Sequence, residues 1–427
     1  MIRSLPLLAG VAGLMLAGTA SAAGKPLFNP GNGQADARND RVLERLLSNP
    51  STRDVKLVNV DASASDGNQI ELYVGGRRVT ADRQRSERTA GGSDVWYGRV
   101  QHSRQPGYAP RETTADPLND VVLVRRGNQI TGSVRVDGQL YRIRPLPSGA
   151  TAVIEVDESR MPADHPEDAY QQIFDAAVRD KVGTMARPCN PRKETCGGGG
   201  GTPVEPGPTQ TIRVMVVATN DAVSAYGGDM QGLVELAVAE SNQGYVNSNV
   251  GINMVLANYS TTSYGTVGMS TDLSRFRGTS DGYMDTIHAT RDASAADVGV
   301  LVDNDASACG LASGIGSTAA TAFAVAYWDC ITGYYSFAHE VGHLQSARHD
   351  PATDSSTSPY PYGHGYREPG NAWRTVMAYN CTGAGCPRIN YWSNPAVTYG
   401  GVPMGTYDKS HNQRVLVETK ATIAGFR

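Results

Sequence analysis

Three histidines and one glutamate in YYSFAHEVGHLQSARHD, residues 334–350, have the types and spacing of a catalytic metal site. His339 and His343 are four residues apart, so in a helix both imidazoles lie on one face and can bind one ion. Glu340 is offset by one position and would reach a water molecule rather than the ion. His349 follows His343 by six residues, which suits a chain that leaves the helix and folds back to supply a third ligand.

The chemistry that this set predicts is zinc-assisted hydrolysis. Three neutral nitrogens leave Zn2+ an open fourth position, as in catalytic rather than structural zinc sites. Zinc would acidify the water there and polarise a scissile carbonyl, while Glu340 takes the proton and passes it to the leaving amine. A helical pair of ordinary core or surface histidines is the alternative, and His349 makes it the weaker one.

Two segments resemble the metzincin zinc proteases. Residues 339–349 are similar to the signature H-E-x-x-H-x-x-G-x-x-H, and TVMAYN, residues 375–380, is similar to the Met-turn. The resemblance implies that Met377 lies beneath the metal. Tyr379 has the spacing of members in which a tyrosine ligates zinc or stabilises the oxyanion, and a packed structural tyrosine is the alternative. Ser346 replaces the usual glycine, where a left-handed backbone would cost about 1 kcal/mol.

A closer resemblance is to the bacterial peptidyl-Asp metalloendopeptidases, and it spans most of residues 211–427. It rests on HEVGHLQSARHDP, YGHGYR, WRTVMAYNC and SNPAVTYGG. It implies a secreted zinc endopeptidase that cleaves proteins on the N-terminal side of Asp or Glu. A fixed positive charge would then have to bind the acidic side chain, and the nearby candidates are Arg374, Arg388 and Arg367.

Three further residues or segments near the zinc ligands receive expectations. Asp350 directly follows the third histidine, and we expect it to anchor the Met-turn by hydrogen bonds. ACGLASGIGS, residues 308–317, is expected to hold an edge strand that binds substrate by strand addition, with an ordinary loop as the alternative. His364 lies between two glycines and is expected to be structural.

The elements that must position these residues form an α+β domain. Continuous apolar runs predict buried strands at 211–219, 251–260 and 297–304, a long helix at 228–248 and a shorter helix at 282–293. A strand, helix and strand in succession predict a parallel pair. We therefore expect a metzincin-like domain with a mixed, mostly parallel sheet and long helices over residues 211–427.

The upstream half predicts a different unit. Its short β-rich runs, separated by Gly, Asn and Asp turns, predict a mostly antiparallel β domain at residues 23–196. VWYGRV, GQLYRIRPL and EVDESRMPADHPE resemble the propeptides of reprolysin-like proteases, which implies an inhibitory propeptide and a zymogen. GGGGGTPVEPGPTQ, residues 197–210, is expected to be an exposed linker at or near which the propeptide is removed.

The composition and the N-terminal residues indicate where the protein is located and which partners it has. Arg3, the apolar run at 5–16 and Ala20-Ser21-Ala22 predict a signal peptide at residues 1–22 and a secreted product. No later run is long enough to span a membrane. The net charge of -4 and the lack of a basic stripe argue against nucleic acid. The expected partners are protein or peptide substrates and the propeptide, and the expected state is a monomer.

The six cysteines suit an oxidising compartment. Local spacing favours three pairs, although six cysteines allow 15 pairings. The pairs are Cys189 with Cys196, Cys309 with Cys330 and Cys381 with Cys386. Cys189 is alternatively an unpaired thiolate that ligates zinc in the latent form.

Two other functions compete with the metzincin interpretation. A gluzincin-type protease would take its third ligand from a glutamate, and Glu368 is the candidate. A non-catalytic secreted protein that binds zinc structurally, for example in adhesion, is the other. Glu340 argues against it, because a structural site has no use for a general base.

Overall fold

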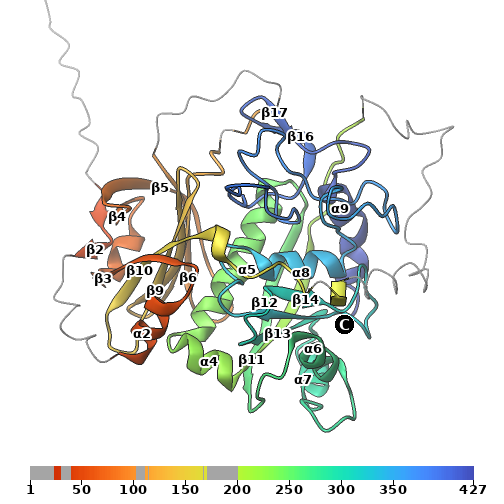
Figure 1. The fold of residues 1–427 in the computed structure, drawn as a ribbon, viewed down its shortest axis with the longest axis horizontal. Helices are drawn as coiled ribbons and strands as arrows, with labels where there is room; N and C mark the ends of the chain where they lie inside the picture. The colour runs from red at the N-terminus through yellow and green to blue at the C-terminus, as the bar shows by residue number, and fades with distance from the viewer. Residues whose placement is uncertain (1–23, 30–39, 102–110, 114, 167, 171–200) are drawn as a thin grey trace, which may run out of the picture.

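The computed structural model describes residues 24–29, 40–101, 111–113, 115–166, 168–170 and 201–427. The predicted signal peptide, Cys189, Cys196 and the first glycines of the predicted linker lie outside these residues. The described chain is built around two large sheets, with a long helix between them (Figure 1).

The first sheet has ten strands in the order β1-β4-β5-β6-β7-β8-β9-β10-β3-β2. The strands are β1 Lys25–Pro26, β2 Phe28–Asn29, β3 Thr52–Val60, β4 Gln69–Val74, β5 Arg77–Arg88, β6 Asp94–Val100, β7 Asp120–Arg126, β8 Gln129–Val136, β9 Gln139–Pro145 and β10 Thr151–Val156. Every pair is antiparallel except β1 with β4. Antiparallel pairing follows where short turns join neighbouring strands. The alternation of buried and more exposed residues, as in β4, fits a sheet with one face on a core.

The first sheet curls until its two ends meet at residues 25–29. This short segment supplies both terminal strands, and the Leu27 amide donates to Glu71 O while Leu27 O accepts from the Asp61 amide. An apolar core fills the inside of the curled sheet; among its residues are Leu27, Ile70, Leu72, Trp96, Val134 and Ile143. The outermost long strands of the sheet are β4 and β3. Part of the outer edge of β4 pairs with β1, and part of the outer edge of β3 pairs with β2.

The second sheet has five strands in the order β12-β11-β13-β15-β14. The strands are β11 Gln210–Thr219, β12 Ile252–Thr262, β13 Val298–Asp303, β14 Gly310–Ala312 and β15 Phe323–Tyr327. Four strands are parallel, and β14 runs antiparallel to β15 at the edge. The three predicted strands and their parallel pairing are therefore confirmed, and residues 310–312 form the expected edge strand.

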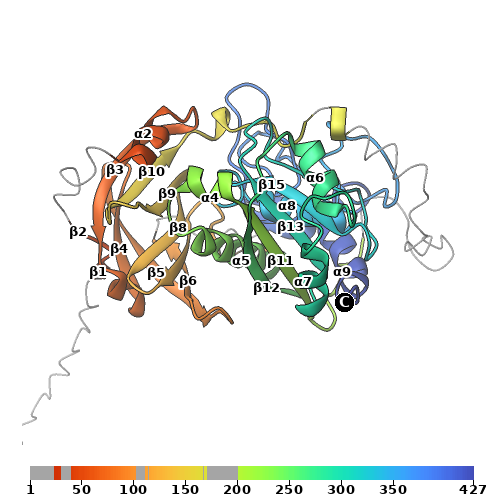
Figure 2. The same cartoon turned by 90° about the horizontal axis from the view of Figure 1, so that it is seen from below.

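Helices cover this second sheet on both faces (Figure 2). They are α4 Asn220–Tyr226, α5 Met230–Asn247, α6 Met269–Arg277, α7 Ile287–Ala293, α8 Ser336–Leu344 and α9 Asn412–Ile423. Beyond α8 the chain is largely irregular except for a small hairpin, β16 Asn394–Tyr399 with β17 Val402–Met404.

Helix α5 lies between the two sheets and is buried on nearly all sides. Leu236 and Ala239 pack against Val95, Val122 and Val124 of the first sheet. The opposite face of α5 packs on the second sheet. Both faces of the helix are thus removed from water, including the polar residues Glu235, Glu240 and Asn242.

The predicted helix at 282–293 is too long. The observed helix α7 begins only at Ile287, because Gly282 and Met284 have φ angles of 86° and 52°, which no α-helix contains. Helix α6 was not predicted. On the N-terminal side, α2 Arg41–Ser48 packs on the outside of the curled sheet, and two short 3-10 turns occur at Ala62–Asp66 and Glu158–Arg160. Within the described ranges, no helix has the length and apolar character to cross a bilayer.

Candidate active site

Helix α8 carries His339, Glu340 and His343, and its end sets the position of His349. The Ser346 amide donates to His343 O and the Ala347 amide to Gly342 O, so the helix stops in a Schellman turn. Ser346 has a φ of 74°, which confirms the left-handed backbone expected at the position where the metzincin signature has glycine. The chain therefore reverses at once and returns His349 to the helix.

The three predicted imidazoles meet, and a fourth joins them. The Nε2 atoms of His339, His343, His349 and His165 lie 2.9–3.2 Å from one another. All four residues are buried. His165 comes from the N-terminal half, between the first sheet and the predicted linker.

This arrangement fits a tetrahedral metal ion. Zn–N bonds of 2.0–2.1 Å place the nitrogens of a tetrahedron about 3.3 Å apart, close to the observed separations. Burial lowers the pKa of His165 to about 4 and the pKa values of the other three well below the usual range, so all four rings are neutral. Neutral Nε2 lone pairs that face each other repel, and a cation between them removes the repulsion.

The Nδ1 atoms fix which nitrogen faces the centre. His339 Nδ1 lies 2.9 Å from Val376 O, His343 Nδ1 lies 2.8 Å from Ala347 O, and His165 Nδ1 lies 2.9 Å from Gly310 O. Each of these three Nδ1–H groups donates to a carbonyl, so each of the three Nε2 atoms presents its lone pair inward. His349 Nδ1 has no hydrogen-bond partner among the described residues. The structure thus brings all three predicted ligands together with one residue that was not predicted, in a group able to hold a metal ion.

Glu340 and the Met-turn surround this centre. The Glu340 carboxylate is buried, and its Oε1 lies 3.7 Å from His165 Nδ1. Burial raises the pKa of Glu340 well above its usual range, and Asp164 nearby raises it further. Met377 is fully buried in the core that also contains Val341, as expected for a residue beneath the site. The Tyr379 ring lies 4.3 Å from the His349 ring, and burial raises the pKa of its hydroxyl.

Two of the three candidate arginines hold one buried carboxylate, that of Asp164, beside the imidazole cluster, and we call the place of this carboxylate the acid pocket. Arg374 and Arg388 are both fully buried, and they lie on adjacent extended segments that are bridged by backbone hydrogen bonds. Arg388 Nη2 donates to both carboxylate oxygens of Asp164 at 2.7 Å, and Arg374 Nη1 lies 3.8 Å from the same carboxylate. Tyr334 supports both, because its carbonyl accepts from Arg388 and its hydroxyl from Arg374.

Asp164 is ionised in this pocket. Burial by itself would raise the pKa of its carboxyl group, but Arg388 and Arg374 hold the pKa below its usual range. Among the described residues it is the carboxylate that forms ion pairs with these two arginines. The pocket is therefore a site for one negatively charged group.

The third candidate arginine and two other residues have structural positions. Arg367 Nη2 pairs with Asp350 at 2.9 Å, and its Nε donates to Tyr379 O. Asp350 also accepts from the Tyr379 amide, which confirms its expected role in anchoring the Met-turn. His364 bonds to His349 O and Ser356 O, as expected of a structural histidine.

The gluzincin alternative is wrong. Glu368 does not belong to the group of residues able to share an ion, and its carboxylate accepts from the Ala372 amide within its own turn. The loop from His349 to the Met-turn holds it away from the imidazoles.

Two of the expected disulfides are present. Cys309–Cys330 ties the start of β14 to the loop before α8, and Cys381–Cys386 closes the loop beside Arg388. Cys189 and Cys196 lie outside the described residues, so their pairing stays a prediction.

Sequence reasoning missed His165 and Asp164 as site residues. Both lie in EVDESRMPADHPE, which had indicated only a resemblance to propeptides. The imidazoles and arginines that they contact are 174 or more residues away, so no local spacing marks them.

The fold and the site define a metallopeptidase, and comparison with known proteins agrees. The model of the metallo-peptidase family M12, Reprolysin_5, matches residues 208–393. The peptidyl-Asp metalloendopeptidase of Stenotrophomonas maltophilia (strain K279a) is 56% identical over 426 residues, which cover 98% of this chain and 97% of that protein. The protein of the same name from Xanthomonas campestris pv. campestris is 53% identical over 427 residues and 98% of both chains. A third, from Pseudomonas fragi, is 56% identical over 190 residues, or 44% of this chain and 100% of that protein.

The chain therefore belongs to the bacterial peptidyl-Asp metalloendopeptidases and is a metalloendopeptidase. This assignment excludes the non-catalytic alternative.

Proposed function

We propose that this protein is a zinc-dependent endopeptidase that cleaves proteins on the N-terminal side of Asp or Glu. The observation that carries the proposal is a metal-ready set of imidazoles beside a buried carboxylate and a buried pair of arginines. His339, His343 and His349 are the zinc ligands. Zinc is the metal that suits neutral imidazoles in tetrahedral positions, and it would supply a water of lowered pKa and a polarised carbonyl.

The residues of the chain divide the remaining work. Glu340 accepts a proton from the attacking water and delivers it to the leaving amine. Burial raises its pKa, so the carboxyl group can hold the transferred proton until the amine leaves. Tyr379 is proposed to donate its hydroxyl hydrogen to the oxyanion, since its pKa is raised and the hydroxyl stays protonated.

Arg388 and Arg374 are proposed to bind the acidic side chain of the substrate. A carboxylate already accepts two hydrogen bonds from Arg388 in this pocket, so the geometry for an aspartate is present. Two buried guanidinium groups without a counter-ion cost free energy. A substrate with an uncharged side chain at this position would leave both charges unpaired and would therefore bind less well. Arg367 is excluded from this role by its pairing with Asp350.

The test uses the processed protein and a set of peptides that differ only at one position, which is Asp, Glu or Asn. Wild type should cleave before Asp and Glu, and Glu340→Gln should lose nearly all turnover while it keeps its zinc. Arg388→Gln should lower kcat/KM for the Asp peptide by about tenfold to a hundredfold. The ratio of kcat/KM for the Asp peptide to kcat/KM for the Asn peptide should therefore fall. Arg277→Gln, an exposed arginine on α6, is the matched control. Zinc-loaded wild type that cuts none of the peptides, or that cuts without regard to charge, would contradict the proposal.

We also propose that the protein is secreted and is made as a zymogen. Residues 1–22 would be a signal peptide, 23–196 the propeptide, 197–210 the linker and 211–427 the catalytic domain. The support is the apolar N-terminal run and the insertion of His165 from the N-terminal half into the site. Intact-mass measurement of the intracellular and extracellular forms tests this, since it shows both cut positions.

A further inference from the structure

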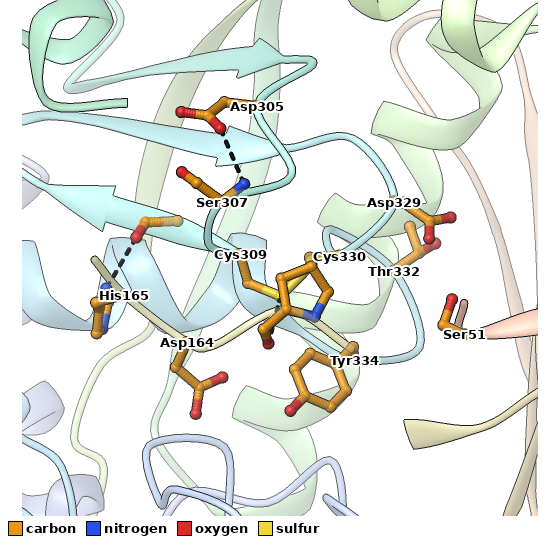
Figure 3. Close-up of a disulfide and its surroundings, with 12 residues drawn as sticks. Ser51, Asp164, His165, Asp305, Ser307, Cys309, Asp329, Cys330, Thr332 and Tyr334 are labelled. Carbon is orange, nitrogen blue, oxygen red and sulfur yellow. Dashed lines mark hydrogen bonds between the residues drawn. A yellow bond between two sulfur atoms is a disulfide. The ribbon is translucent and has the colours of Figure 1, made fainter. Parts of the chain in front are cut away.

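The segment Ala163–His165 lies along the edge of the catalytic sheet. The Cys309 amide donates to Ala163 O at 2.8 Å, and the Gly310 amide donates to Asp164 O at 3.1 Å. Gly310 O lies 2.9 Å from His165 Nδ1. Figure 3 shows this segment beside the Cys309–Cys330 disulfide, which anchors the residue before β14. A strand edge that accepts an extended segment in this way is a peptide-binding surface.

His165 stands where a fourth ligand belongs. Its Nε2 lies 3.1, 3.1 and 2.9 Å from the Nε2 atoms of His339, His343 and His349. The hydrogen bond from its Nδ1 to Gly310 O orients the ring and leaves the Nε2 lone pair facing the centre. With His165 in place, the vacant position that hydrolysis requires is filled by protein.

Asp164 fills the neighbouring pocket at the same time. Its carboxylate is held by Arg388 and lies within ion-pair distance of Arg374, and 7% of the residue is exposed. Consecutive residues of one segment thus satisfy both the metal centre and the arginine pair. A single contact would block only the metal centre or only the arginine pair. Together, Asp164 and His165 occupy both sites that an acidic substrate would use.

The polarity of the segment explains why it is not an ordinary substrate. A bond cut before aspartate must present the preceding carbonyl to the metal. Here the preceding carbonyl, Ala163 O, accepts from the Cys309 amide, and the group at the metal centre belongs to the residue after the aspartate. The segment runs in the same direction as β14, since Cys309 and Gly310 donate in order to Ala163 and Asp164.

Tyr170 extends the cover to the third ligand. Its ring lies 4.2 Å from the His349 ring, and its hydroxyl donates to Asp354 at 2.6 Å. Arg348 holds Asp354 through two hydrogen bonds. The segment is thereby fixed on both sides of the metal centre.

We propose that Asp164 and His165 form a two-point latch that keeps the precursor inactive, with His165 as the fourth zinc ligand and Asp164 as the occupant of the acid pocket. This inference rests on the zinc centre and the acid pocket proposed above. Activation then requires removal of this segment, and cleavage in the linker alone leaves the latch in place until the N-terminal half departs.

The test of the metal contact uses the full precursor with Glu340→Gln, so that the chain stays intact, and Co2+ as a spectroscopic substitute for zinc. The visible absorption of Co2+ reports the number and type of its ligands. With His165 present, we expect a four-nitrogen spectrum that does not change when acetohydroxamate is added. His165→Ala should shift the spectrum and make it respond to acetohydroxamate, and added imidazole should restore the original bands. His288→Ala, on α7, is the matched control.

The outcomes separate the latch from the proposed function. If His165→Ala leaves the spectrum and the hydroxamate response unchanged while His343→Ala abolishes Co2+ binding, the latch is wrong and the metal centre stands. If His343→Ala binds Co2+ as well as its parent does, the metal centre is wrong too. Circular dichroism of each variant shows whether it is folded.

The pocket contact is tested by the rate at which a chelator removes Co2+ from the same precursor. Asp164→Asn should accelerate removal by about tenfold, because loss of the charged anchor lets the segment open more often. Asp168→Asn, an exposed aspartate of the same region, should leave the rate unchanged. Equal rates for the two variants would overturn the role of Asp164.

Discussion

At the scale of single residues, Ser346 has a left-handed backbone that costs conformational free energy but brings His349 back to the helix. The chain must reverse between His343 and His349, and the C′ position of the Schellman turn takes a left-handed backbone whichever residue stands there. Serine has a side chain that disfavours this backbone, whereas glycine does not.

Ser346→Gly is therefore expected to stabilise the protein by about 1 kcal/mol. The gain would appear as a rise of about 2 °C in Tm in a calorimetric scan. Ser274→Gly, at an exposed position within α6, should instead destabilise by about 0.5 kcal/mol, because the backbone there is helical. A lower Tm for Ser346→Gly would show that the serine side chain contributes something the backbone argument omits.

The same scale shows what sequence reasoning can reach. His339, Glu340, His343 and His349 were found because helical periodicity and a short return loop bring them together within eleven positions. His165 shares no local pattern with them. Only the fold of the N-terminal half carries it across 174 positions to His339, and sequence spacing contains no information about that path.

At the scale of elements, strand β14 and helix α8 approach so closely that one glycine decides the position of Glu340. A Cβ at Gly310 would lie 2.6 Å from Glu340 Cγ and 2.7 Å from its Cδ. The backbone of β14 is fixed by its pairing with β15 and by Cys309–Cys330, so the glutamate would have to move.

Gly310→Ala is expected to lower kcat of the processed enzyme by about a hundredfold, because Glu340, the proposed general base, is displaced from its position. Zinc content should stay unchanged, since no proposed ligand touches this Cβ. Gly314→Ala, whose Cβ would meet only Gly316 O at 3.3 Å, is the matched control. Loss of zinc together with activity would show that the strain spreads to the ligands instead.

Element prediction succeeded for the long apolar runs and failed for the short, polar helix α6. Strands β11 and β13 were found because their residues are almost continuously apolar. Helix α6, MSTDLSRFR, was missed because it is short and polar, and only Met269, Asp272, Leu273 and Phe276 are buried. The length of α5 was predicted well, but its place between two sheets follows from tertiary packing alone.

At the scale of the whole molecule, the contact between the two halves contains ionisable groups as well as apolar ones. Arg142 of β9 pairs with Asp329 at 2.9 Å, and Arg126 of β7 pairs with Asp229. Glu240 of α5 is buried in the same region and accepts from the Gly333 amide at 2.8 Å. Burial raises the pKa of Glu240 to about 7 and that of Asp120 on β7 to about 6.

These raised values predict a pH dependence of stability. At Glu240 and Asp120 the folded chain binds more protons than the unfolded chain between the ordinary carboxyl pKa and about 7, so the stability that these two groups contribute should be lost as pH rises through this window. The four imidazoles of lowered pKa contribute in the opposite direction. Urea unfolding of the precursor at pH 5 and pH 8 measures this. Glu240→Gln should remove the contribution of Glu240, so that relative to wild type its free energy of unfolding at pH 8 rises against that at pH 5, and the contribution of Asp120 should remain. An unchanged pH dependence in Glu240→Gln would mean that the carboxyl group is hydrated.

The segment at residues 25–29 joins both ends of the first sheet, and this has a consequence for biogenesis. These residues precede every other strand of the described chain, so during synthesis they emerge before β3 and β4 and stay unpaired until those strands have followed. Until β1 and β2 have paired with them, β3 and β4 each have an unpaired strand edge that another polypeptide chain could bind. A precursor trimmed past Asn29 would keep those borders permanently, and self-association rather than loss of catalysis would be its first defect.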